Sequence, residues 1–410
     1  MSRTSMLFLV LLALLWWAAG NLRRAMPPQS VVIQAGPPGG SFDVHARRYA
    51  REMALRDVRV AVRNQDDSLR IIDKVQDALG GVQIGFTAQR VAEQRYPDVA
   101  SAGVVELQPL FLFLRRDQPA PATPAGLAGH RIVMPLEGSA TAQAARDLLA
   151  CYGVTGSNAA LQFLQMDQAA QALQHGDADA GFFMLAPSNA LVRRLATDPA
   201  LVAYSFADSL GIARNIDYLR PATLARGALD LTGPLPRRDL ALVGANVDVV
   251  VRKDIHPAVL YALLQAMDAE HKGQTLVSDA GEYPRQSGAA LPIHPLAEAW
   301  RKSGTPWLYT HLPGSMAGVV DAYWGPVLAL LTLVSITGTI KSLGRFLDGA
   351  VMFAALRSLA WLQWRADRGL APGPASRWLF GLLDRVMIRR DVEEVALAQL
   401  EQLRERFDAP

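Results

Sequence analysis

The chain has one cysteine, Cys151, among its 410 residues. A single cysteine excludes an internal disulfide and any metal cluster held by several thiolates. It also excludes a lipoprotein anchor, because no cysteine follows the apolar run near the N-terminus. Cys151 lies near the end of a predicted helix, and we interpret it as a small buried hydrophobic residue rather than a nucleophile.

Charged residues are sparse as well, at 19% of the chain, whereas hydrophobic residues make up 50%. This balance is typical of a folded protein with a sizeable core. The formal net charge is +3, and the surplus of Lys and Arg lies between Lys341 and Arg390. No DNA- or RNA-binding motif accompanies these residues. We therefore interpret them as membrane-flanking charges and expect no nucleic-acid partner.

Signatures of catalysis and of metal binding are missing. The seven histidines are scattered, without an H-x-x-x-H or H-E-x-x-H pair. Gly138-Ser139 does not fit the G-x-S-x-G pattern of a nucleophile, and the glycines in 36–40 lack the G-x-G-x-x-G spacing of a dinucleotide site. Asp177 and Asp179 have too few oxygen ligands nearby for Ca²⁺. We expect a protein that is not an enzyme, with no cofactor and no bound metal.

An apolar run near the start predicts an export signal. Residues 6–19 are apolar, with Arg3 before them and Arg23 and Arg24 after them. Fourteen residues are few for a membrane span but typical of the core of a secretory signal. Residues 1–26 are therefore either a signal peptide or an uncleaved signal-anchor, and both would export the chain that follows.

A second apolar run predicts a membrane span near the C-terminus. Residues 322–340 contain no charge, begin with Tyr323 and Trp324, and are followed by Lys341 and Arg345. Aromatic residues at one boundary and basic residues at the other predict a transmembrane helix over 319–341; the alternative is a buried core helix. The span would place the preceding domain in the periplasm, in an inner-membrane protein, and the helical tail 342–410 in the cytoplasm. Residues 349–364 predict a helix on the membrane surface, and 392–407 predict an amphipathic terminal helix.

The middle of the chain alternates between strand and helix patterns. Strands are predicted over 31–35, 58–63, 82–87, 110–114, 131–134, 180–184 and 247–252, and helices over 43–56, 68–78, 140–150, 168–174 and 257–271. This alternation predicts an α/β architecture with parallel strands. Ligands of such sheets bind where strands end and helices begin. The proline-rich segment 119–124 predicts a linker between two lobes.

Two similar loops about a hundred residues apart each lead from a predicted strand into a helix. The first contains Gly39, Gly40 and Ser41, and the second contains Gly138, Ser139 and Thr141. Small residues and a hydroxyl at a helix start leave N–H groups and the positive end of the helix dipole available to an anion. Two such loops predict two lobes that hold one small ligand.

Several segments together resemble the TAXI family of solute-binding proteins, which serve TRAP-type transporters. The first loop, Gln34 to Phe42, is similar to that family's G-x-x-G-G-T-Y loop, and Gly80 to Gln89 resembles its strand ending near a ligand-side glutamine. Further similar segments are 107–113, 127–141, 176–183, 292–298 and 304–308. No single motif is specific, and the likeness lies in their order and spacing over residues 30–345.

The resemblance implies a type II periplasmic binding-protein fold, an α/β fold with two lobes that close over a ligand cleft. It implies a binding domain over 27–312, with lobe 1 at about 30–115 and 246–300 and lobe 2 at about 120–245. Ligands of the family are small carboxylates and acidic amino acids, and its partners are the membrane subunits of TRAP transporters. The expected function is binding of a small organic anion or amino acid for such transport.

The sequence also departs from that family. The family's T-G-G-S turn is replaced by Asn64 to Ser68, and Asp66 and Asp67 would repel a carboxylate unless they pair or point away. The ligand is therefore either changed, to an amine, an amino acid or a bound cation, or lost. Ser41-Phe42 keeps the family's hydroxyl but lacks its tyrosine hydroxyl.

The candidate ligand-binding residues come from both loops and from the segments named above. They are Gly39, Gly40, Ser41, Phe42, Gln65, Ser68, Gln89, Gly138, Ser139, Thr141, Phe182 and Phe183. One of the two phenylalanines is expected to face the cleft, with core packing of both as the alternative. His45, among Arg47 and Arg48, is interpreted as part of a solvated helix face.

Two other functions remain open. The first is a ligand-sensing or accessory module on the same fold, which would signal through the transmembrane helix to the tail. The second is an exported enzyme on an α/β scaffold, which would need an acid–base pair in the cleft with perturbed pKa values.

Overall fold

A computed structural model describes residues 25–28, 30–312, 314–368 and 378–383, with five further residues between 398 and 405. The chain divides into two compact units, 1–322 and 323–410, and each is described by itself. The predicted signal run 6–19 and the terminal helix predicted over 392–407 lie outside the described residues, apart from a few positions of the latter.

The first unit is built on one ten-stranded sheet. Its strands are β1 (Val31–Ala35), β2 (Val60–Asn64), β3 (Ile84–Thr87), β4 (Val99–Arg115), β5 (Arg131–Pro135), β6 (Ala160–Leu164), β7 (Ala180–Met184), β8 (Leu201–Ala203), β9 (Leu219–Leu224) and β10 (Leu240–Arg252). Their order is β2-β1-β3-β10-β4-β7-β5-β6, with β8 beside β4 and β9 beside β10. β1 pairs in parallel with β2 and β3, and β5 pairs in parallel with β6 and β7. We call the part of this unit around β1, β2 and β3 lobe 1 and the part around β5, β6 and β7 lobe 2.

Two long antiparallel strands, β4 and β10, join the lobes. Within β4, Val99–Leu110 pairs with β10 and Leu110–Leu114 pairs with β7. β10 pairs with β9 through its first half and with β3 through its second. Register shifts after Val247 and Val249 mark bulges, which bend a strand locally. The chain therefore crosses between lobes inside β4, and the predicted linker 119–124 instead follows β4 within lobe 2.

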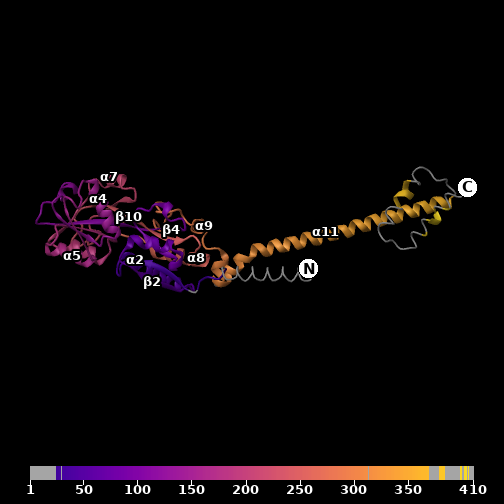
Figure 1. Cartoon of the computed structure of the whole chain (residues 1–410), viewed down its shortest axis with the longest axis horizontal. Coiled ribbons are helices and arrows are strands. Elements are labelled where there is room, and N and C mark those ends of the chain that lie inside the picture. Colours follow the sequence, from indigo (N-terminus) through magenta and orange to yellow (C-terminus); the bar gives the residue numbers. More distant parts are fainter. Residues whose placement is uncertain are drawn as a thin grey trace. The chain divides into compact units, whose positions relative to one another are not determined.

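Helices cover the sheet at both ends. Lobe 1 has α2 (Ser41–Ala54), α3 (Ile71–Gln76), α8 (Pro257–His271), α9 (Pro295–Ser303) and α10 (Trp307–His311), with short 3₁₀ turns η1 (Ser68–Arg70), η2 (Ala78–Gly80) and η3 (Glu93–Arg95). Lobe 2 has α4 (Ala140–Cys151), α5 (Met166–His175), α6 (Ala190–Thr197), α7 (Ser209–Asn215) and η4 (Pro124–Leu127). Figure 1 shows α2, α8 and α9 at one end of this unit and α4, α5 and α7 at the other, with β4 and β10 between them.

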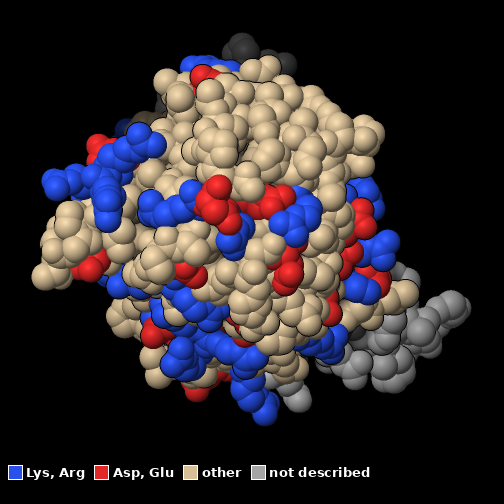
Figure 2. Space-filling model, turned by 90° about the vertical axis from the view of Figure 1, so that its left-hand side faces the viewer, with Lys and Arg blue, Asp and Glu red and all other residues tan. Residues whose placement is uncertain are grey.

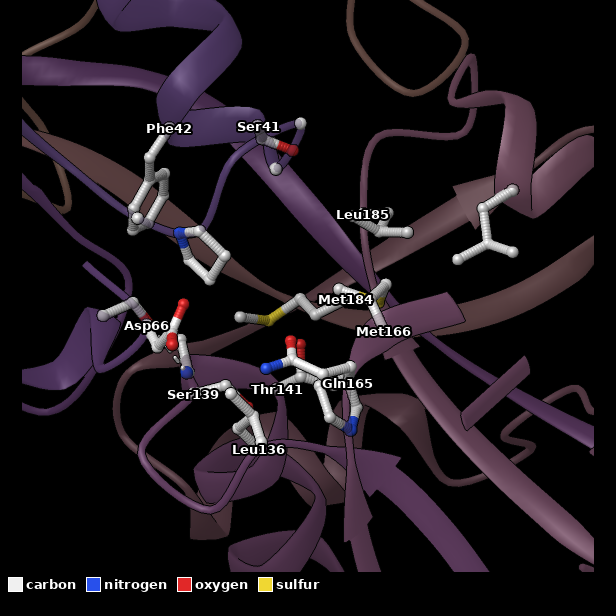
Figure 3. Close-up of a pocket in the computed structure, with 18 of the residues that line it drawn as sticks. Ser41, Phe42, Asp66, Leu136, Ser139, Thr141, Gln165, Met166, Met184 and Leu185 are labelled. Atoms are coloured by element: carbon white, nitrogen blue, oxygen red, sulfur yellow. Dashed lines mark hydrogen bonds between the residues drawn. The ribbon is translucent and has the colours of Figure 1, made fainter. Parts of the chain in front are cut away.

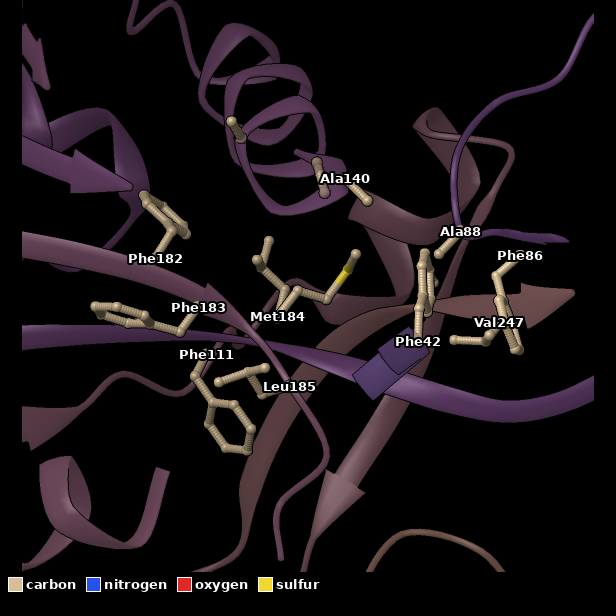
Figure 4. Packing of buried hydrophobic residues seen from close by; sticks show 14 of the residues in the cluster. Phe42, Phe86, Ala88, Phe111, Ala140, Phe182, Phe183, Met184, Leu185 and Val247 are labelled. Atoms are coloured by element: carbon tan, nitrogen blue, oxygen red, sulfur yellow. The ribbon is translucent and has the colours of Figure 1, made fainter. Parts of the chain in front are cut away.

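The core follows from helix and strand periodicity. In α2, Phe42, Ala46, Tyr49 and Met53 recur every three or four residues and are all buried, as expected of a helix with one face on a sheet. Ser139 precedes α4, and its hydroxyl accepts a hydrogen bond from the Ala142 N–H at 3.1 Å, the usual form of an N-cap. Figure 4 shows core side chains of both lobes, from Phe182 and Phe183 to Phe42 and Phe86.

Most of the predicted elements are present, although several bounds differ. The helix predicted over 68–78 is instead divided among η1, α3 and the start of η2, and β6, β8, β9, α6, α7, α9 and α10 were not predicted. The strands over 31–35 and 180–184 have the predicted bounds, but 110–114 and 247–252 are only the ends of β4 and β10. The sheet is accordingly mixed rather than parallel throughout. Cys151 is the last residue of α4 and is exposed, so its interpretation as a buried residue is wrong.

The second unit contains most of the helix α11 (Gly314–Asp367). This helix is 54 residues long and begins in the first unit. Leu359 and Leu362 of α11 pack with Leu383 and Leu403. Among the residues that the structure describes, no helix has the length and apolarity needed to cross a bilayer. The predicted span 319–341 lies in α11, largely among residues whose side chains are outside the description, and its membrane insertion stays a prediction.

Candidate functional site

A cavity of about 230 Å³ lies between the two lobes. Lobe 1 contributes the loop before α2 and the residues before η1, and lobe 2 contributes the starts of α4, α5 and α6 and the end of β7. The lining residues are Gly36 to Phe42, Asp66, Ser68, Gln108, Pro135, Leu136, Ser139, Ala140, Thr141, Gln165, Met166, Asp167, Met184, Leu185, Asn189 and Leu191. Part of this lining is drawn in Figure 3.

Seven of the twelve predicted site residues line this cavity: Gly39, Gly40, Ser41, Phe42, Ser68, Ser139 and Thr141. Phe182 and Phe183 do not, because both side chains are fully buried in the core. The next two residues, Met184 and Leu185, reach the cavity in their place.

Gln65 and Gln89 hold the chain around η1 rather than line the cavity. The side-chain amide of Gln65 donates to the Asp67 carbonyl at 2.5 Å, and that of Gln89 donates to the Leu69 carbonyl at 2.9 Å. Both glutamines therefore fix the segment that places Asp66 and Ser68 at the cavity.

Gly138 belongs to the contact between the lobes. Its carbonyl accepts a hydrogen bond from the Leu69 N–H at 3.2 Å, and a Cβ atom at this position would lie 2.7 Å from Cγ of Asp67. Beside it, the Ser68 hydroxyl accepts from the Ala140 N–H at 3.2 Å. The lobes are therefore in contact along one edge of the cavity, and glycine is needed there for the close approach.

The loop before α2 is already occupied by a carboxylate of the chain itself. Asp43 is 4% exposed and accepts from the Gly39 N–H at 3.0 Å, from the Asn64 amide at 2.8 Å and from Arg47 at 2.9 Å. Burial opposes its charge, yet these donors together hold the pKa of Asp43 below its ordinary value. Because Asp43 already supplies the negative charge favoured at a helix start, this loop has little left to offer an external anion.

The start of α4 is also partly satisfied from within. The Ser139 hydroxyl accepts a hydrogen bond from the Ala142 N–H, and the Ser68 hydroxyl accepts one from the Ala140 N–H. The hydroxyl of Thr141, which is 5% exposed, lines the cavity at the same helix start. Of the two loops that the sequence predicts, the one before α4 therefore keeps a reduced capacity for anions. The starts of α5 and α6, with Gln165 and Asn189 as their N-caps, also line the cavity.

Charge in the cavity is negative. The lining residues include Asp66 and Asp167 but neither Lys nor Arg. Asp167 pairs with Arg194 at 3.1 Å, whereas Asp66 has no hydrogen bond or ion pair among the described residues. Figure 3 shows Asp66 and Gln165 pointing from opposite lobes toward the space beside Met184. Asp66 is exposed, so its carboxylate is open to solvent and can accept a charge-assisted hydrogen bond from a cationic group on a ligand.

Gln108 adds an acceptor at the cavity. It lies on β4 where the lobes join, and its Nε2 donates to Oε1 of Glu106 at 2.5 Å. A carboxylate can only accept, so the amide nitrogen must face Glu106 and the amide oxygen is left for a ligand. Gln108 and Asp66 therefore both offer oxygen acceptors to the cavity, next to the apolar side chains of Phe42, Met184 and Leu185.

A buried polar cluster lies behind Gln108. Nε2 of His45 is 3.1 Å from Oε1 of Glu106, the rings of His45 and His271 are 4.7 Å apart, and the Tyr49 hydroxyl is 2.7 Å from Nε2 of His271. His45 is 8% exposed, so the prediction that it lies on a solvated face is wrong. The cluster joins α2, β4 and α8 behind the cavity.

The electrostatics of this cluster favour an ionised pair beside a neutral histidine. Burial alone would lower the pKa of His45, but the negative Glu106 raises it above its ordinary value. Burial opposes ionisation of Glu106, yet His45 holds the pKa of Glu106 at about 2. Burial and then the positive His45 lower the pKa of His271 to about 3. His45 is thus the cation, and His271 is the neutral partner of Tyr49.

Sequence reasoning missed Asp43, Glu106 and Gln108. Asp43 had a local signal, since an acid in the first turn of a helix complements the helix dipole. Glu106 and Gln108 had none, because their surroundings come from β10, α2 and α8, far away in the sequence.

Comparisons with known proteins give a distant likeness only. No protein-family model matches the chain, and no curated protein matches it. Among solved structures, an ancestral arginine-binding protein bound to arginine has 14% identity and a TM-score of 0.39, over 61% of this chain and 95% of that one. An alkanesulfonate-binding protein from Xanthomonas axonopodis pv. citri, bound to MOPS, has 14% identity and a TM-score of 0.39, over 59% and 74%. An amino acid ABC transporter substrate-binding protein from Streptococcus pneumoniae, bound to L-arginine, has 14% identity and a TM-score of 0.37, over 59% and 88%. These neighbours are binding proteins rather than enzymes.

Proposed function

We propose that the two lobes form an extracytoplasmic solute-binding domain for a small molecule with an ammonium group and an apolar part, such as an amino acid. The observation that carries this proposal is the unpaired carboxylate of Asp66 in an inter-lobe cavity whose lining has no Lys or Arg. The proposed ligand therefore differs from the small carboxylates of the resembled family, because it carries an ammonium group, as amines and amino acids do.

The cavity can hold each part of such a ligand. The ammonium group would lie between Asp66 and the amide oxygen of Gln108, and the apolar part would contact Phe42, Met184 and Leu185. A carboxylate, where the ligand has one, would lie at the start of α4 near the Thr141 hydroxyl. At about 230 Å³ the cavity is smaller than the roughly 300–1,000 Å³ pockets of drug-sized ligands, which favours a small solute.

Closure of the lobes would report that the site is occupied. The contacts of Leu69 with Gly138 and of Ser68 with Ala140 exist only when the lobes meet, and the exposed ion pair Arg90–Asp217, at 3.0 Å, adds a third. A ligand that touches both lobes favours this closed form through its higher affinity for it. We propose that the closed form docks on the membrane subunits of a TRAP-type transporter, as the resemblance implies.

A tether would assist this docking. With the predicted span 319–341 in the inner membrane, the domain stays near its transporter, and a high effective concentration makes a weak docking affinity sufficient. The alternative proposal is a sensor that signals through the span. It is supported by the continuation of α11 to Asp367, well past the end of the predicted span. Affinity capture through the tail separates the two: a stable cytoplasmic partner supports sensing, and capture of transporter subunits alone supports transport.

A thermal-shift screen of the full chain tests the ligand class. The compounds are grouped by carbon skeleton, for example leucine, its deaminated acid and its decarboxylated amine. We expect shifts that grow with concentration, as mass action requires, for compounds with the amine. Asp66→Asn should weaken binding about tenfold or more, because it removes a charge-assisted hydrogen bond.

Glu93→Gln is the matched control, since it makes the same charge change at an exposed carboxylate outside the cavity. Equal shifts in wild type and Asp66→Asn would contradict the assigned role of Asp66. A response confined to compounds without an amine would contradict the proposed ligand class.

A further inference from the structure

A second cavity, of about 360 Å³, lies within lobe 2. It is lined by Phe111, Phe113, Arg116, Val192, Ala196, Leu201, Val202, Ala203, Leu224, Leu229, Leu235, Pro236, Arg237, Arg238 and Leu240. The lining is therefore apolar except for three arginines, and it includes no acid. We propose that this cavity binds an amphipathic carboxylate, with the alkyl or aryl tail inside and the carboxylate at the arginines.

The apolar wall is part of the rigid core. Phe111 and Phe113 are at most 1% exposed and lie on β4, with their rings 5.9 Å apart. On a strand, alternate residues point to opposite faces of the sheet. Phe111 and Phe113 therefore face away from Gln108 and from the inter-lobe cavity, and the two cavities lie on opposite faces of β4. The helix α6 contributes to both linings, with Leu191 at the first cavity and Val192 and Ala196 at the second.

The outer wall is a hydrogen-bonded hairpin rather than a loose loop. The Leu229 N–H donates to the Leu235 carbonyl at 2.8 Å, and the Leu235 N–H donates to the Asp230 carbonyl at 2.9 Å. The Gly227 N–H donates to the Pro236 carbonyl at 3.0 Å. This hairpin presents Leu229, Leu235 and Pro236 to the cavity and ends at Arg237 and Arg238.

The arginines give the cavity its charge preference. Arg237 and Arg238 are exposed and have no ion pair or hydrogen bond among the residues that the structure describes. The Nε of Arg116 donates a hydrogen bond to the Leu201 carbonyl at 2.8 Å, which leaves its two terminal nitrogens available to an anion. On the face of the molecule seen in Figure 2, basic and acidic side chains lie together in a mixed band. Nearby acids are already engaged: Asp230 accepts from Thr232 and Asp239 from the Arg226 N–H.

This combination favours a carboxylate with a tail over other small molecules. Guanidinium groups bind carboxylates by paired hydrogen bonds, and each buried methylene adds about fourfold to affinity. Polar anions would leave the apolar wall unused, and amines would be repelled by the arginines.

Calorimetry on the full chain tests the proposal, with butanoate, hexanoate and octanoate as probes and octanol and octylamine as controls. We expect affinity to rise about fourfold per methylene along the acids. Octanol should bind about tenfold more weakly than octanoate, and octylamine more weakly still. Arg237→Gln/Arg238→Gln should weaken octanoate about tenfold, and Ala196→Phe, which fills the cavity, should abolish binding.

Three controls keep the result specific. Arg214→Gln/Arg226→Gln removes two exposed charges outside the cavity lining and should leave octanoate binding unchanged. Asp66→Asn should also leave it unchanged, while Arg237→Gln/Arg238→Gln should leave amine binding at the inter-lobe cavity unchanged, so the two sites are separated. The proposal is overturned by no binding of octanoate, by equal binding of octanol, or by binding that survives both cavity variants.

Discussion

Replacing His45 by leucine removes the cation beside Glu106 and leaves its carboxylate buried. The His45 and Glu106 side chains are 11% and 14% exposed, and their charged atoms are 3.1 Å apart. Breaking a buried ion pair by removing one partner costs about 3–5 kcal/mol of folding stability. We expect His45→Leu to lose about that much near pH 6, measured as the shift of the denaturant midpoint of the full chain by tryptophan fluorescence.

The pH dependence of this cost identifies its origin. The pKa of His45 is raised in the folded protein, so the stability that it contributes is complete below about pH 6.5 and is lost as the pH rises through the raised value. The pKa of Glu106 is lowered to about 2, so its contribution is complete above about pH 4.5 and is lost as the pH falls toward 2. The difference between wild type and variant should therefore be largest between these limits.

The double variant His45→Leu/Glu106→Gln supplies the control. It has no buried charge at this position, and we expect it to regain most of the stability lost in His45→Leu. A loss that is the same at about pH 5.5 and about pH 9, or a double variant no more stable than the single one, would refute the electrostatic explanation.

Three further variants test other parts of the structure. Gly138→Ala would place a Cβ 2.7 Å from Cγ of Asp67, so ligand affinity should fall at least about tenfold with little change in the unfolding midpoint; unchanged affinity would mean that this inter-lobe contact is dispensable. Phe182→Ala should lower the folding stability by about 3–5 kcal/mol, because the ring is fully buried, and the folded fraction should bind ligand normally. A loss of affinity in the folded fraction would show that Phe182 belongs to the binding site after all. The pKa of His271 is lowered to about 3, so its contribution to stability is complete above about pH 6.5 and is lost as the pH falls below it. Wild type should lose up to about 1.4 kcal/mol per pH unit more than His271→Gln in that range, and parallel stability profiles would contradict the neutral state assigned to His271.

Local patterns predicted the parts of the fold that depend on neighbours in sequence. The strand 31–35 follows from a short apolar run, and it was predicted. The helix after Ser139 was predicted too, but the Ser139 hydroxyl was assigned to a ligand, whereas it caps α4. The long strands β4 and β10 were predicted only at their ends. Pro109 and Gly244 interrupt the apolar pattern where the lobes join, and the two strands are paired across more than a hundred residues of chain.

Charge at the cavity was harder to predict than its position. The two similar loops located the cavity because small residues and hydroxyls at helix starts are local features. Whether those helix starts are free depends on Asp43 and Ser68, which the fold directs onto the Gly39 and Ala140 N–H groups. His45 was misinterpreted because Arg47 and Arg48 beside it suggested a solvated face, although His45, Tyr49 and Met53 share the buried face of α2.

The central claim is that Asp66 receives the ammonium group of a small ligand in the inter-lobe cavity. Calorimetry with the best amine-bearing ligand and its deaminated analogue, on wild type and Asp66→Asn, tests it most directly. We expect the amine to bind wild type at least about tenfold more tightly than its analogue, and this preference to disappear in Asp66→Asn. An analogue that binds wild type as tightly as the amine, or an amine preference that persists in Asp66→Asn, would contradict the claim.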